Sequence, residues 1–240
     1  MFIPDYLGKD AWKLPMVNRD HFKLSPLLES NEIENGNEFI KQNYMPWIEF
    51  DVQYGHATWL KEIIGIENKF SIFETEYGKG WKHIIVYDGN WNQDLITSCP
   101  SMMSWLKNVF PIKFNVKKID EIKVMALESN GYSDLQHDKE CGQINLPLSE
   151  PPGCTSVMFY PNPMDKTKLK DQDYIGKIPF KEGTIIKINT ENYHMVKNTS
   201  NETRYHVIIN ADTEVDEKIE SFYDENIKNT IGNIKKDARI

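Results

Sequence analysis

The stretch that decides the fold reads Glu182-Gly-Thr-Ile-Ile-Lys-Ile-Asn-Thr-Glu-Asn-Tyr-His194-Met-Val-Lys-Asn-Thr-Ser-Asn-Glu-Thr-Arg204-Tyr-His-Val-Ile-Ile-Asn210. Residues 184–188 are mostly β-branched and predict a strand, and Arg204 opens a second β run over 205–209. A polar segment with His194 and a turn rich in Asn, Ser and Thr lies between them. This order brings one histidine and one arginine to the same mouth of an antiparallel barrel. An imidazole suits a transition metal, and a guanidinium suits a carboxylate.

The rarity of arginine gives Arg204 more weight. The chain has 28 basic residues, and only Arg19, Arg204 and Arg239 are arginines. Because lysine serves wherever charge alone is needed, an arginine here favours a planar, bidentate contact with a carboxylate.

Length and composition limit the class of protein. With 240 residues and 40% hydrophobic content, the chain is long enough for one sizeable domain. A net charge of −8 argues against a general binder of nucleic acid or anionic membrane, since both need a basic face. Cys99, Cys141 and Cys154 show no CxxC spacing, which is typical of reduced thiols in an intracellular protein. We find no secretion signal and no apolar run of roughly 18 residues, so we expect a cytoplasmic protein.

Hydrophobic periodicity gives the order of elements along this single domain. We expect an irregular, aromatic-rich arm over 1–50, a β core over 80–212, and a C-terminal helix and tail over 213–240. Helices are predicted at 58–66 and after Ser98, where the Met and Trp stripe is read as core. A turn is predicted at 129–131 and a projecting polar loop at 165–176. The predicted strands are 70–74, 83–87, 119–127, a run reaching His137, 143–148, 155–160, 184–188 and 205–209.

The second half of the chain holds a set of residues suited to a metal. His137 is followed by Asp138, His194 comes 57 positions after His137, and Arg204 lies ten further on. Two imidazoles and one carboxylate at one end of a barrel form the facial arrangement that binds Fe(II) and leaves positions for a co-substrate and dioxygen.

With these residues in place, the chain resembles the Fe(II)/2-oxoglutarate-dependent oxygenases, and within them the aspartyl/asparaginyl β-hydroxylase-like group. The resemblance covers about residues 80–212 and is strongest over 182–210. The matching pieces are Cys99-Pro-Ser before a helix, Leu127-Glu-Ser-Asn-Gly131, His137 with Asp138, Asn145-Leu-Pro-Leu148, and the stretch from Glu182 through His194 to Arg204-Tyr-His-Val-Ile.

The resemblance implies both a fold and an activity. The fold is mainly β with flanking helices around a double-stranded β-helix, also called a jelly-roll or cupin-like core. His137 and His194 are implied as catalytic iron ligands, and Arg204 as the partner of the distal carboxylate of 2-oxoglutarate. Fe(II) and 2-oxoglutarate are the implied cofactors. The implied activity is a dioxygenase that hydroxylates an unactivated C–H of an amino acid, peptide side chain or small acid, with dioxygen as partner and neither nucleic acid nor membrane.

The chain departs from the family pattern in two respects. The position two after His137 is Lys139, and the carboxylate comes one residue early, at Asp138, which a period-two strand sends to the opposite face unless the chain bulges. Basic residues that hold the keto acid in that group are replaced here by Gln143 and Asn145. Trp81 and His83 are candidates to line the substrate opening, and aromatic packing is the alternative for Trp81.

Two other readings stay open on the sequence alone. One is a cupin-like binding or scaffold protein with a decayed metal site, which Lys139 and the missing basic residues suit. The other is a keto-acid-independent metal enzyme on the same fold, in which Arg204 binds the carboxylate of the substrate itself.

Overall fold

The computed structural model describes residues 47–50, 52–73, 75, 78–136, 143–159, 174–190 and 192–213. Strands dominate this part of the chain, and four α-helices and one 3-10 helix accompany them. The helices are α2 (His56–Ile64), η4 (Glu67–Lys69), α3 (Gln93–Ser98), α4 (Pro100–Asn108) and α5 (Phe110–Lys113). The strands are β1 (Trp47–Phe50), β2 (Ser71–Ile72), β3 (Gly78–Tyr87), β4 (Val116–Gln136), β5 (Gln143–Ser149), β6 (Cys154–Phe159), β7 (Tyr174–Lys177), β8 (Ile185–Ile188), β9 (Tyr193–Asn198) and β10 (Arg204–Thr213). No helix in the described ranges is long and apolar enough to cross a membrane.

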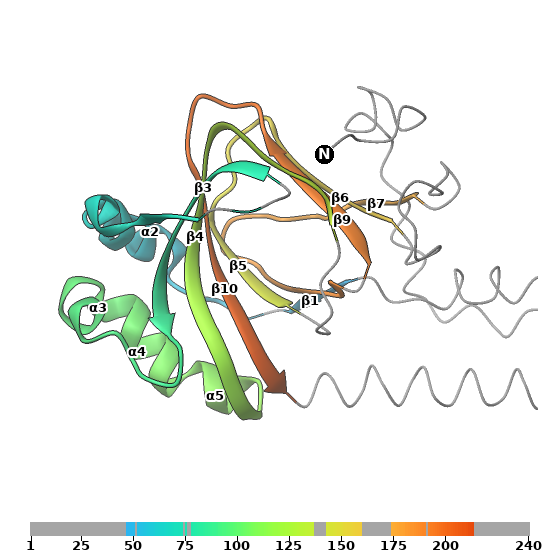
Figure 1. The fold of residues 1–240 in the computed structure, drawn as a ribbon. Coiled ribbons are helices and arrows are strands. Elements are labelled where there is room, and N and C mark those ends of the chain that lie inside the picture. Colours follow the sequence, from blue (N-terminus) through green and yellow to red (C-terminus); the bar gives the residue numbers. More distant parts are fainter. Residues whose placement is uncertain are drawn as a thin grey trace, which may run out of the picture.

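The strands form one curled antiparallel sheet in the order β1-β8-β5-β10-β4-β9-β6-β7, with β2 and β3 added beside β4. Figure 1 shows the two wings of this sheet: β3, β4, β10 and β5 on the side of the helices, and β6, β7 and β9 on the other. Strand β4 joins the wings because its first half pairs with β10 and its second half with β9. The prediction of a mainly β fold with flanking helices is confirmed.

The wing formed by β3, β4, β10 and β5 has two different faces, because side chains alternate along each strand. On β10, the side chains of Tyr205, Val207 and Ile209 belong to the main hydrophobic core. The α-helices cover this face, as Figure 1 shows, and contribute the buried side chains of Trp59, Met102, Leu106 and Phe110. The predicted Met and Trp stripe is therefore core. The alternate side chains, Arg204, His206 and Ile208, point to the inside of the curled sheet, because successive strand residues face opposite ways.

A bend within β4 carries the chain from one wing to the other. Asn130 has a φ of 59°, and the pairing of β3 with β4 shifts between Lys79 and Trp81. The side-chain amide of Asn198 donates to the carbonyls of Leu127 (3.0 Å), Glu128 (3.2 Å) and Glu202 (2.7 Å), which secures the bend. The predicted turn at 129–131 is thus a bulge inside one continuous strand.

Gly80 lies where the backbones of β3 and β4 approach each other closely. Its φ is +78°, and a Cβ there would lie 2.8 Å from the Cα of Gly131. Gly89 has a similar φ of +87° with open space around it. We expect Gly89→Ala to cost about 1 kcal/mol through backbone strain, and Gly80→Ala about 2–3 kcal/mol because overlap is added. Urea unfolding of both variants measures the difference, and equal losses would show that the close approach is unimportant.

Three strands lie where the sequence predicted none, and one of them is β9, Tyr193–Asn198, which was predicted as a polar segment holding His194. Trp47–Phe50, placed in the irregular arm, pairs with β8 as an edge strand and buries Trp47. Tyr174–Lys177, placed at the end of the polar loop, pairs with β6. Both runs are only four residues long, too short to show a period, and their neighbours stabilise them. The predictions for His137, Asp138, Cys141, most of the arm, and the C-terminal helix and tail lie outside the described residues.

Candidate active site

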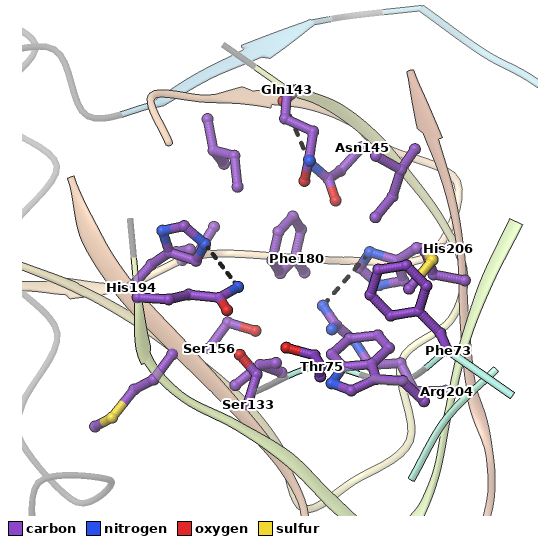
Figure 2. A pocket seen from close by; sticks show the side chains of 18 of the residues that line it. Phe73, Thr75, Ser133, Gln143, Asn145, Ser156, Phe180, His194, Arg204 and His206 are labelled. Carbon is purple, nitrogen blue, oxygen red and sulfur yellow. Dashed lines mark hydrogen bonds between the residues drawn. The ribbon is translucent and has the colours of Figure 1, made fainter. Parts of the chain in front are cut away.

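The curled sheet encloses a cavity of about 340 Å³ between its two wings. This volume is in the range of pockets that hold small molecules. Figure 2 shows His194 on one side and Arg204 with His206 on the opposite side. The described lining residues include no Asp or Glu; they are Phe73, Thr75, Trp81, Lys123, Met125, Ser133, Gln136, Gln143, Asn145, Ser156, Ile178, Phe180, Ile188, His194, Met195, Val196, Arg204, His206 and Ile208.

His194, on β9, has a contact at each of its two ring nitrogens. Its Nδ1 lies 2.9 Å from the backbone carbonyl oxygen of Asn192. Because a carbonyl only accepts, Nδ1 carries the proton and Nε2 carries the lone pair. The side-chain amide of Gln136, which also lines the cavity, lies 3.5 Å from that Nε2. A hydrogen bond that fixes the tautomer of a histidine in this way is typical of metal-ligating histidines.

Strand register places Gln136, the residue before His137 in the sequence, beside His194. The Cα of Gln136 pairs with that of His194 across β4 and β9, and Met158 of β6 pairs with His194 on the other side. Gln136 directly precedes His137 in the chain, and His137 and Asp138 are outside the described residues. Within the ranges that the structure covers, no three His, Cys, Asp or Glu side chains group as a metal site.

Arg204, the first residue of β10, is buried and held on three sides. Its Nε donates to Oε2 of Glu150 at 2.7 Å, and its Nη2 lies 3.4 Å from Nδ1 of His206. The guanidinium carbon also lies 4.9 Å from the ring centre of Phe180. The sequence predicted a guanidinium in the cavity, and Arg204 lines it. It did not predict that an internal carboxylate already takes one edge of that guanidinium.

His206 and Glu150 complete this group. Nε2 of His206 lies 2.7 Å from the same Oε2 of Glu150, so the ring donates there and its Nδ1 accepts from Arg204. Burial first, and the Arg204 charge second, lower the pKa of His206 to about 4. Burial would raise the pKa of the Glu150 carboxyl, but the charge of Arg204 and the hydrogen bond from His206 hold that pKa at about 2. At neutral pH the group is a neutral imidazole between a guanidinium and a carboxylate.

These two pKa shifts predict acid sensitivity. Unfolded His206 takes up a proton near pH 6.5, whereas the folded form resists it down to about 4, so stability is lost as pH falls through that window. The Glu150 carboxyl causes a further loss of stability as pH falls from about 4.5 to 2, because its pKa is depressed in the folded protein. We expect each group to contribute on the order of 2 kcal/mol. Urea unfolding from pH 7.5 to 4.5 measures the His206 part of this slope, which His206→Gln should flatten; an unchanged slope would contradict the assignment.

The other predicted site residues lie as follows. Gln143 and Asn145 both line the cavity from β5, and the Asn145 side-chain amide donates to the Gln143 carbonyl at 3.2 Å. Trp81 also lines the cavity. His83 is not among the lining residues; its ring packs edge-on against Phe73, with 5.1 Å between ring centres. Among the described predictions, the structure therefore brings together His194, Arg204, Gln143, Asn145 and Trp81.

Sequence reasoning missed most of the cavity lining, and His206, Phe180 and Ser156 show why. His206 carries a usable signal, because it lies two residues after Arg204 and shares its face by the period of a strand. Phe180 and Ser156 carry none, since both reach the cavity only through tertiary structure. The Ser156 hydroxyl is buried and has no hydrogen-bond partner, so a ligand or water in the cavity would meet a free polar group.

Comparison with known proteins supports the fold. No family model matches the sequence, and no curated protein matches it. Among solved structures, the fold is similar to a prolyl hydroxylase from Trichoplax adhaerens in complex with a hypoxia inducible factor peptide fragment, with a TM-score of 0.53 and 11% identity over 73% of this chain and 87% of that one. It is also similar to the non-heme alpha ketoglutarate dependent epimerase SnoN from nogalamycin biosynthesis, with a TM-score of 0.50 and 10% identity over 71% and 77%. The predicted double-stranded β-helix fold is confirmed.

Proposed function

We propose that the protein is a non-haem Fe(II)- and 2-oxoglutarate-dependent oxygenase that hydroxylates an unactivated C–H of an amino acid, a peptide side chain or a small acid. One observation carries the proposal: an imidazole whose Nε2 meets only the long contact of the Gln136 amide and a guanidinium face the same cavity from opposite sides, without a carboxylate among the described lining residues. The two solved structures above, by their names a hydroxylase and an alpha ketoglutarate dependent epimerase, add support at the level of the fold.

The residues present fit these cofactors. His194 supplies one imidazole nitrogen to the metal, and His137, the residue after Gln136, supplies the second. Asp138 is the candidate carboxylate. Arg204 binds the distal carboxylate of the keto acid, while Gln143 and Asn145 offer amide hydrogen bonds to its other end. Bound Fe(II) and 2-oxoglutarate supply dioxygen activation and the oxidising power for C–H hydroxylation.

The rest of the cavity wall orients the ligands and excludes water. Ile178, Phe180 and Ile188 give an apolar wall beside the polar groups, which strengthens the charge-assisted contact at Arg204. Trp81 lies where it can contact a substrate, and His83, which packs on Phe73, supports that side of the wall.

Anaerobic titration tests the proposal. Protein with Fe(II) should develop the weak visible charge-transfer band when 2-oxoglutarate is added, and should release succinate under dioxygen with a suitable substrate. Metal binding without this band would favour the keto-acid-independent enzyme. Failure to bind either Fe(II) or 2-oxoglutarate would favour the cupin-like binding or scaffold protein.

Asp138 is expected to matter less than the histidines. If the Asp138 carboxylate does not bind the metal directly but hydrogen-bonds to one of its ligands, Asp138→Ala should weaken metal affinity by about tenfold. Isothermal titration with Mn(II), compared between Asp138→Ala and His194→Ala, gives the rank order. A crystal structure with the Asp138 carboxylate bonded to the metal would reverse it.

A further inference from the structure

We propose that Glu150 is an internal counter-ion of Arg204 that weakens carboxylate binding in the cavity and stabilises the site while no acid is bound. The inference rests on the proposed function and names what sets the affinity of its acid subsite.

The geometry gives Glu150 this role and no direct contact with a ligand. A single oxygen, Oε2, accepts from Nε of Arg204 and from Nε2 of His206, both at 2.7 Å. Glu150 is not among the lining residues, whereas Arg204 and His206 both are. Its backbone N–H donates to Oε1 of Glu182 at 3.0 Å, which fixes the start of the loop after β5. The carboxylate therefore lies behind the two side chains that meet the ligand.

The pair leaves only part of Arg204 for a ligand. With Nε bound to Glu150 and Nη2 near His206, the guanidinium presents its remaining Nη hydrogens to the cavity. An acid from outside would bind end-on, at a guanidinium whose charge another carboxylate already balances. Ligand and Glu150 then share one cation, and two carboxylates on one buried cation repel each other.

Burial strengthens the repulsion between the ligand carboxylate and Glu150. The side chains of Arg204 and Glu150 are 6% and 14% exposed, so water compensates little for either charge. The other cation among the described lining residues, Lys123, has a similar partner: its Nζ lies 2.6 Å from Oε2 of Glu121. The side chains of Lys123 and Glu121 are 17% and 30% exposed, so if Glu121 is removed, water can solvate the Lys123 charge better than it can solvate Arg204. The two pairs form a matched comparison within one protein.

Thermodynamic linkage gives the direction of the effect. Replacing Glu150 with Gln keeps the shape and one acceptor oxygen but leaves a buried guanidinium without its counter-charge. This cost is borne by the ligand-free protein, and a bound carboxylate relieves it. Glu150→Gln should therefore lower the melting temperature without ligand and raise the affinity for an acid.

The experiment measures binding to the Mn(II)-loaded protein, where no turnover occurs. For Glu150→Gln we expect the Kd of 2-oxoglutarate to fall by at least about tenfold, because the variant removes the repulsion between two carboxylates on one guanidinium, which is strong at an effective dielectric of about 20. The Kd of 2-oxobutyrate, which lacks the distal carboxylate, should stay within about twofold. Glu150→Asp keeps the charge, and Glu121→Gln alters the solvated pair, so neither should raise the affinity for 2-oxoglutarate.

The outcomes separate this inference from the proposed function. A Glu150→Gln protein that binds 2-oxoglutarate no better than wild type, or more weakly, overturns the counter-ion role while the oxygenase proposal stands. A wild-type protein that binds no 2-oxoglutarate overturns both. Should Glu150→Gln unfold on its own, refolding by 2-oxoglutarate but not by 2-oxobutyrate, followed as a thermal shift, supports the role, and equal behaviour with the two acids contradicts it.

Discussion

His194→Ala is expected to lose metal binding altogether near neutral pH. The wild-type histidine presents an Nε2 lone pair to the cavity because Asn192 fixes the proton on Nδ1. A site built on two imidazoles cannot lose one without losing most of its affinity, and we expect a decrease of more than about 100-fold. Isothermal titration with Mn(II), and iron content after anaerobic loading, both measure it.

The matched control for this variant is His56→Ala. His56 begins α2 and is not among the residues that line the cavity, so its loss should leave metal content unchanged. Stoichiometric iron in the His194→Ala protein would remove His194 from the metal site. Loss of iron in both variants would point to a general effect on folding, which circular dichroism separates from a lost ligand.

Much of the cavity could be predicted from the sequence because it depends on local pattern. The β-branched run before His194 and the run after Arg204 identify two strands, β8 and β10, which both pair with β5, and period two then places alternate residues on the inner face. The same rule correctly placed Gln143 and Asn145 on one face of β5. These predictions require only that a segment is a strand and that one of its residues is known to face the cavity.

The Glu150 contact could not be predicted because it depends on strand register. Glu150 and Arg204 are 54 residues apart, and they meet because β5 and β10 pair with Tyr205 opposite Ser149 and a shift before His206. A slip of one residue would turn the carboxylate to the other face. Nothing in the residues themselves specifies that register, so the arginine was predicted with its charge unpaired.

The bend in β4 was predicted as a turn for a different reason. Asn130 and Gly131 carry the chemistry of a turn, and a bulge uses the same residues for the same reason, since both need a left-handed or closely approached backbone. The choice between them is made by Asn198, 68 positions beyond Asn130, whose amide binds the carbonyls of Leu127 and Glu128. The long bent strand that carries Gln136 to His194 was therefore read as two strands.

Arg204→Lys is expected to weaken 2-oxoglutarate binding by roughly 30-fold while leaving metal affinity nearly unchanged. A guanidinium can donate from Nε to Glu150 and from its Nη edge to a ligand at the same time. An ammonium at the end of a lysine would pair with Glu150, the nearest carboxylate, and would have no second planar edge for the acid. The expected loss is about 2 kcal/mol, at the low end for a truncated charge-assisted pair because the positive charge is kept.

Titration of the Mn(II)-loaded protein with 2-oxoglutarate measures this loss, and 2-oxobutyrate serves as the control. Since 2-oxobutyrate has no distal carboxylate for Arg204 to bind, its Kd should be the same in wild type and Arg204→Lys. Equal weakening of both acids would mean that the substitution distorts the cavity, whose wall includes Phe180 and His206 beside the guanidinium. An unchanged Kd for 2-oxoglutarate would assign Arg204 to Glu150 alone, as a structural ion pair, and the keto-acid function would then lose its anchoring residue.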